Sequence, residues 1–111
     1  MDLNALQQQL RDFASERNWE PFHTHKNLAM ALMVESAELL EVFQWMTPEQ
    51  SQNVRNDPVE KAKAADEVAD VLLYLLQLAD KLDIDLAQAV EQKLVKNAQK
   101  HPAPQKAGSA E

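Results

Sequence analysis

The sequence predicts an all-α protein: a subunit of the four-helix-bundle type, with a short extra helix between its second and third long helices. Apolar residues recur at helical spacing in four segments, as expected for helices that bury one face. The composition also favours helix, since 111 residues include one glycine and the prolines lie at segment boundaries or near the C-terminal end.

The length suits one domain with a modest core. We expect this domain to span residues 1–102, followed by a flexible C-terminal tail over residues 103–111. Cysteine is absent, which excludes a disulfide framework and a thiolate zinc site. We see no secretory signal, and acids interrupt the longest apolar stretch, so we expect a soluble, cytoplasmic protein without a membrane partner.

The charge balance bears on the kind of ligand. The net charge is −7, and no basic stripe is visible that could neutralise the phosphates of a nucleic-acid polymer. An acidic protein can still bind a small polyanion where metal ions supply positive charge. The charge therefore excludes DNA more firmly than it excludes a nucleotide.

The first helix is expected from about Leu3 to Asn18, with Asp2 as its N-cap. A loop should follow over residues 19–23, because Pro21 disfavours helix in the residue before it. Two aromatic residues and a histidine stand close together in this loop. They are either a hydrophobic plug that holds the loop to the bundle or a wall on which a planar ligand stacks.

The second helix should begin near residues 24–27 and end at Met46. Thr47-Pro48 then has the form of a helix start, with a hydroxyl N-cap and proline at the first position, and it predicts a short helix ending near Arg55. The same signal at residues 56–60 opens a third long helix that runs to about Leu82.

This third helix is apolar in nearly every direction, so it must be covered on all sides. One small subunit can hardly do that, and a homodimer or larger assembly is expected. A fourth helix is expected from the cap at Asp85 to about Gln99.

Two pairs of acids lie in the second and third helices. Glu35 and Glu38 form one pair, Glu67 and Asp70 the other, each at a spacing of i, i+3 that places both carboxylates on one side of a helix. Their surroundings are apolar, where an unpaired charge is costly. Carboxylate oxygens are the ligands that hard divalent cations prefer, so the pairs predict a metal site. Glu41 is expected outside it.

Two aromatic residues fall in register with the acids, and a separate basic strip is predicted on the fourth helix. Trp45 and Tyr74 share the helix faces of the acids, although ordinary core packing explains them equally well. Lys93, Asn97 and Lys100 form a basic strip on the fourth helix, a pattern more typical of a solvated face.

Rival sites are less consistent with the residues. A di-iron bundle uses Glu-x-x-His pairs, and no histidine follows the four acids at that spacing. A chain with one glycine has no Gly-rich phosphate loop. The simplest alternative is surface salt bridging, for example between Lys63 and Glu67 at i, i+4.

The acid pairs resemble the signature of the all-α nucleoside triphosphate pyrophosphohydrolases, the MazG-like superfamily. The resemblance covers about Phe13 to Pro102 and is closer to the dCTP pyrophosphatase branch. It rests on the segments 16–23, 43–45 and 66–75, extended by Lys93 to Asn97 and Lys100-His101-Pro102. Ser36 departs from the pattern, because many full-length MazG domains carry another acid there.

The resemblance implies hydrolysis of a nucleoside triphosphate to the monophosphate and pyrophosphate with Mg²⁺, for which Mn²⁺ is a candidate substitute. It implies house-cleaning of dCTP-like or non-standard deoxynucleotides, by a homo-oligomer that is a dimer or a tetramer. Glu35, Glu38, Glu67 and Asp70 would be both the catalytic residues and the metal ligands. The substrate-binding residues would be Trp19, Glu20, Pro21, Phe22, His23, Trp45, Tyr74, Lys93 and Asn97. Lys93 and Asn97 would reach the phosphates, with a neighbouring subunit as one source of these two residues.

A non-catalytic helical scaffold is the alternative from a different class. In that case the acids pair with lysines and the aromatic residues belong to the core. The sequence leaves the base preference, the number of metal ions and the identity of the water-orienting acid open.

Overall fold

The computed structural model describes residues 1–104 and is entirely helical over that range, which confirms the predicted fold class. Two residues of the predicted C-terminal tail, 103 and 104, lie in no helix, and residues 105–111 lie outside the described part. The elements in chain order are α1 (Leu3–Glu16), the 3₁₀ turn η1 (Glu20–Phe22), α2 (His25–Phe43), α3 (Pro48–Asn53), the 3₁₀ turn η2 (Val54–Asn56), α4 (Pro58–Lys81) and α5 (Leu86–Lys100).

Side-chain caps begin the helices where the sequence predicts them. The Asp2 and Asp85 carboxylates accept from backbone N–H groups in the first turns of α1 and α5, and Thr47 closes a full capping box with Gln50. The helix ends were harder to predict. Helix α1 stops two residues early because Asn18 adopts φ 56°, a left-handed conformation that asparagine tolerates. Helix α2 ends at Phe43, three residues before the predicted end.

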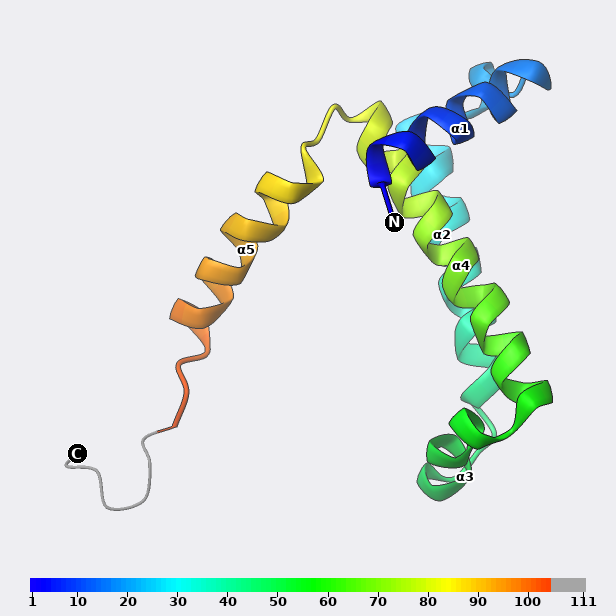
Figure 1. Cartoon of the computed structure of the whole chain (residues 1–111), viewed down its shortest axis with the longest axis vertical. Coiled ribbons are helices and arrows are strands. Elements are labelled where there is room, and N and C mark those ends of the chain that lie inside the picture. Colours follow the sequence, from blue (N-terminus) through cyan, green and yellow to red (C-terminus); the bar gives the residue numbers. More distant parts are fainter. Residues whose placement is uncertain (105–111) are drawn as a thin grey trace.

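An antiparallel pair of long helices forms the centre of the molecule. Helices α2 and α4 run side by side along most of their length, with α3 at the end where they are joined (Figure 1). Leu28 of α2 and Leu76 of α4 are the two fully buried large side chains of the described residues. At the other end, a ring nitrogen of His25 lies 3.1 Å from the Lys81 carbonyl oxygen, which ties the start of α2 to the last turn of α4.

Helix α1 packs against the C-terminal half of α4 through polar contacts as well as apolar ones. The Gln7 amide donates to the Leu76 carbonyl oxygen at 3.0 Å, and Arg11 pairs with Asp80. These contacts place α1 across the C-terminal half of α4. The space between the two helices becomes part of the site described below.

Helix α5 diverges from the other helices. It leaves the turn after α4 and points away from the α2–α4 pair, so the predicted four long helices are present but the single chain does not gather them into one bundle (Figure 1). No α5 residue is buried, and Val90, Leu94 and Val95 expose more than half of their surface. In the described residues, no helix is long and apolar enough to cross a membrane.

Candidate functional site

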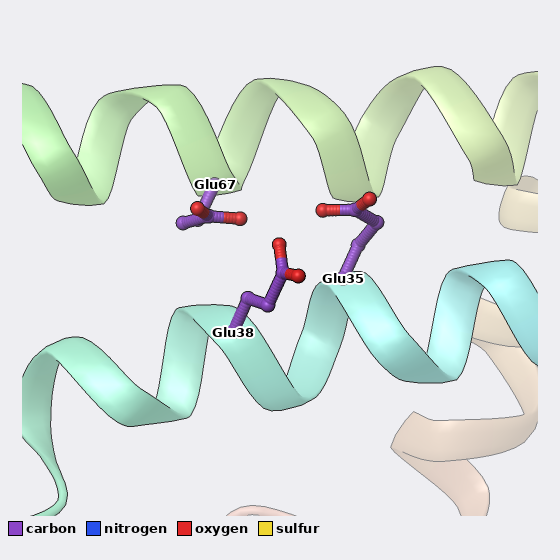
Figure 2. A group of neighbouring side chains, drawn as sticks. All are labelled: Glu35, Glu38 and Glu67. Carbon is purple, nitrogen blue, oxygen red and sulfur yellow. The ribbon is translucent and has the colours of Figure 1, made fainter.

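Three carboxylates converge between α2 and α4. Glu35 and Glu38 project from one face of α2 and Glu67 faces them from α4, so that one oxygen of each lies within 4.8 Å of the others (Figure 2). The i, i+3 spacing puts the first two on the same side of their helix, and the antiparallel packing of α4 supplies the third. The structure therefore brings together three of the four predicted acids.

The electrostatics of this acid cluster are unfavourable without a cation. Among the described residues, Glu35 Oε2 and Glu67 Oε2 are buried and have no hydrogen-bond partner. Burial, a hydrogen bond with Glu38 and the charges of Glu38, Asp70 and Glu67 raise the pKa of Glu35 to about 7. Burial and the neighbouring charges also raise the pKa of Glu67. Unpartnered, mutually repelling carboxylate oxygens fit a divalent metal ion.

The salt-bridge alternative does not hold for the pair that suggested it. Lys63 Nζ lies 3.1 Å from Glu60 Oε1, and Glu60 stands two turns before Glu67; in residues 1–104 this is the ion pair that Lys63 forms. Across residues 1–104, none of the four acids lies within 4.0 Å of a basic group. Residues 1–104 therefore leave the charge of the cluster uncompensated.

Asp70 stands between the acid cluster and an aromatic cavity. It lies outside the group of three, yet its charge contributes to the raised pKa of both Glu35 and Glu67. It also lines a cavity of about 340 Å³ between α1, the 19–23 segment and α4, together with Trp19, His23 and Tyr74. The predicted fourth acid thus connects the other three to the predicted aromatic residues.

The cavity walls are largely apolar and aromatic. The rings of Phe13 and Trp19 meet edge to face with centroids 5.6 Å apart, and the His23 ring centroid is 6.3 Å from that of Trp19. Several lining residues could not be told from packing or solvated positions by sequence alone. They come from α1 and α4 and are Leu6, Gln9, Leu10, Phe13, Ala14, Leu73 and Gln77.

An open acidic cavity of about 550 Å³ lies on the other side of the cluster. Glu38 and Glu67 line it with Glu41, which is exposed and outside the group of three, as predicted from the sequence. Glu41 nevertheless borders the same opening. The acid cluster therefore sits between a mainly apolar cavity and a polar, solvent-open one.

The single chain does not bring the remaining predicted residues to this site. Phe22 is 68% exposed and Trp45 is 89% exposed, because the early end of α2 leaves Trp45 beyond the helix that was to align it with Glu38. Glu20 lines a smaller cavity with Arg11 and Lys81, which adjoins the aromatic cavity and shares His23 and Gln77 with it. Pro21 is exposed in its turn, and Lys93 and Asn97 are exposed on α5.

The raised pKa of Glu35 predicts how the metal-free protein responds to pH. In the folded chain the pKa of Glu35 is about 7, so it holds a proton up to that pH, whereas in the unfolded chain it ionises near its ordinary pKa of 4.5. Between these values the native state binds more protons, so this contribution to the free energy of unfolding is lost as pH rises from about 4.5 to about 7. Thermal unfolding in the presence of a chelator, repeated across this pH range, measures this loss of stability. Glu67 adds a contribution of the same sign, because its pKa is also raised.

Glu35→Gln is the matched control, because glutamine keeps the shape of the side chain and does not titrate. As pH rises from about 4.5 to about 7, the unfolding temperature of the variant should increase relative to that of the native protein. Excess Mg²⁺ should oppose that shift, since a cation replaces the proton between the carboxylates. A difference that stays constant from pH 4.5 to 7 contradicts the prediction.

Comparison with known proteins gives a family match and several close relatives. A family model described as the MazG-like family matches residues 30–111. Mouse dCTP pyrophosphatase 1 is 42% identical over 99 residues, which cover 89% of this chain and 58% of the mouse protein. Human dCTP pyrophosphatase 1 is 42% identical over 92 residues, covering 83% of this chain and 54% of the human protein. The chain thus spans little more than half the length of these relatives.

A solved structure extends the comparison to three dimensions. The crystal structure of a pyrophosphatase from Archaeoglobus fulgidus superposes with a TM-score of 0.81 at 40% identity. The match covers 90% of this chain and 92% of the archaeal chain. The arrangement of helices described above is therefore shared with a protein of similar length.

Proposed function

Because the chain belongs to the MazG-like family, we propose that it hydrolyses deoxynucleoside triphosphates to the monophosphate and pyrophosphate. Its relatives are named dCTP pyrophosphatase and pyrophosphatase, which supports a substrate of this class. House-cleaning of dCTP-like or non-standard nucleotides is the corresponding role. The observation that carries the proposal is the uncompensated acid cluster, joined through Asp70 to an aromatic cavity.

The residues of the cluster fit Mg²⁺, with Mn²⁺ as a substitute. Glu35, Glu38 and Glu67 would hold the ion with their converging oxygens, and Asp70 would complete the set of acids. When bound, the ion supplies charge neutralisation of the phosphates and a water of lowered pKa. The acid ligands fit this hard cation because all of them are oxygen donors.

The chain's own side chains would position the substrate. Trp19, His23 and Tyr74 form the walls on which the base stacks, and Asp70 marks the end of the cavity nearest the other acids. A nucleotide whose base lies in this cavity therefore places its phosphates beside the acid cluster. One of the acids would also accept a hydrogen bond from the attacking water and orient it toward phosphorus, so that catalysis depends mainly on positioning.

We further propose that the working form is a homo-oligomer, a dimer or a tetramer. The radius of gyration is 18.5 Å, whereas a compact domain of 100 residues has about 13 Å. The buried core of the described residues is also small, consisting of Ala14, Leu28, Val54, Leu76 and Ala79. In an oligomer, α5 of a neighbouring copy could bring Lys93 and Asn97 to the phosphates, and Trp45 could meet a second chain.

A panel of deoxynucleoside triphosphates tests the proposed function. The purified protein is incubated with each nucleotide and Mg²⁺, and both products are identified by anion-exchange chromatography. We expect monophosphate and pyrophosphate in equal amounts, with dCTP among the better substrates, and no release when a chelator replaces the metal. Diphosphate with inorganic phosphate would indicate a different reaction. Pyrophosphate release from none of the nucleotides, with either Mg²⁺ or Mn²⁺, would leave the helical scaffold as the function.

A further inference from the structure

One face of α4 carries a row of polar residues from the acid cluster to the far end of the aromatic cavity. Glu67, Asp70, Tyr74 and Gln77 follow at i, i+3, i+7 and i+10, which places them on neighbouring turns of the same face. Asp70, Tyr74 and Gln77 all line the cavity. The seven steps from Asp70 to Gln77 span about 10 Å along the helix axis, comparable with the length of a nucleoside.

The aromatic walls of the cavity cannot identify a base, because every base offers a π-face for stacking. Identity must come from polar groups at the edge of the base. The Tyr74 hydroxyl can both donate and accept, and the His23 ring changes its role with tautomer, so neither imposes one polarity. Gln9 also lines the cavity but is exposed on α1.

Gln77 differs from these residues in having a fixed orientation. Its side chain is half-buried, and its amide nitrogen donates to the Leu73 carbonyl oxygen at 3.2 Å. A carbonyl oxygen can only accept, so the amide nitrogen must be the atom that faces it. One amide hydrogen is thereby used, while Gln77 Oε1 has no hydrogen-bond partner among residues 1–104. The free end of this side chain is an acceptor.

We propose that Gln77 Oε1 accepts a hydrogen bond from the exocyclic amino group of the substrate's base. This inference rests on the proposed function and specifies the substrate class. Cytosine and adenine present an amino group at this edge, whereas uracil, thymine and guanine present a carbonyl oxygen. A carbonyl facing Gln77 Oε1 would leave two acceptors opposed without a donor. Gln77 therefore selects cytosine and adenine over the other bases, and Asp70, the acid that lines the same cavity, marks the phosphate side.

The comparison of dCTP with dUTP tests this proposal, because at this edge the two nucleotides differ by an amino group and a carbonyl. We expect the native protein to show a higher kcat/KM for dCTP. Gln77→Met removes the acceptor while keeping a flexible chain of similar length. It should lower kcat/KM for dCTP by roughly tenfold, mainly through KM, and leave that for dUTP unchanged or higher, because the opposing acceptor is gone. A structural defect would instead lower both.

Gln9→Met is the matched control, since it makes the same change in the same cavity at an exposed position. It should keep the native ratio of dCTP to dUTP. The assignment of Gln77 is overturned if Gln77→Met keeps the native ratio of kcat/KM for dCTP to that for dUTP. It is also overturned if Gln9→Met loses the preference for dCTP. Either result leaves the proposed hydrolysis intact.

Binding of the monophosphates separates this inference from the proposed function. If the native protein hydrolyses neither nucleotide, the proposed function fails, and calorimetry with dCMP and dUMP still decides the role of Gln77. Tighter binding of dCMP that is lost in Gln77→Met supports the proposal. Equal affinity of the native protein for dCMP and dUMP overturns it.

Discussion

Replacing Glu38 by glutamine is expected to lower kcat for nucleotide hydrolysis by roughly 10²–10³-fold while leaving the helical fold intact. Glu38 belongs to the group of three converging carboxylates, and its charge raises the pKa of both Glu35 and Glu67. Glutamine keeps the shape but supplies a neutral ligand to the cation. Hydrolysis is measured by pyrophosphate release at saturating Mg²⁺, and the fold by circular dichroism.

The same substitution should raise the thermal stability of the metal-free protein, because it removes one of the repelling charges. Loss of turnover with a gain in stability is a combination that damage to the fold cannot produce. Glu41→Gln is the matched control: it lies one turn further along α2, is exposed and stands outside the group of three. Its activity should remain close to native. Near-normal Mg²⁺-dependent hydrolysis in Glu38→Gln contradicts the proposed metal site.

Leu94→Glu should break the proposed assembly and with it the activity. Leu94 lies on α5, which has no buried residue in the single chain, and 63% of its surface is exposed. An apolar interface would have to bury the new carboxylate without a partner, which costs about 3 kcal/mol or more and weakens association by roughly a hundredfold. Light scattering should show the mass falling from a multiple of 12.6 kDa toward 12.6 kDa.

Gln92→Glu provides the control for the added charge. It adds the same charge to α5 two residues away, at an exposed position outside the apolar strip formed by Val90, Leu94 and Val95. This variant should keep the native mass and activity. A native protein that is monomeric at micromolar concentration, or a Leu94→Glu variant that keeps both its mass and its activity, contradicts the proposed assembly.

The order of the helices and their starting points could be predicted because the determinants are local. Each predicted cap is a short side chain that accepts a hydrogen bond from the next turn, as at Asp2, Thr47 and Asp85. Helix ends depend more on tertiary context. Asn18 ends α1 through a left-handed conformation that its amide permits but that the apolar spacing does not reveal.

The acid cluster could be predicted because its spacing is regular on each helix and the helices pack antiparallel. The cavity beside it could be predicted only in part. Its floor on α4 follows from the alignment of Tyr74 with Asp70, whereas its opposite wall depends on how α1 crosses α4. Phe13 and Gln9 come from that wall, and nothing in their local sequence distinguishes them from packing or solvated positions.

The small buried core has a consequence for how substitutions act on this protein. Only a few side chains are fully enclosed in the described residues of one chain, while large apolar residues such as Met33, Leu40 and Leu94 are exposed. Under the proposed assembly, these positions should tolerate mutation as poorly as interior positions do. The free energy of folding of the chain would also depend on protein concentration, because association stabilises the folded state by mass action. Dilution would then inactivate the protein by unfolding it, without any change in its covalent structure.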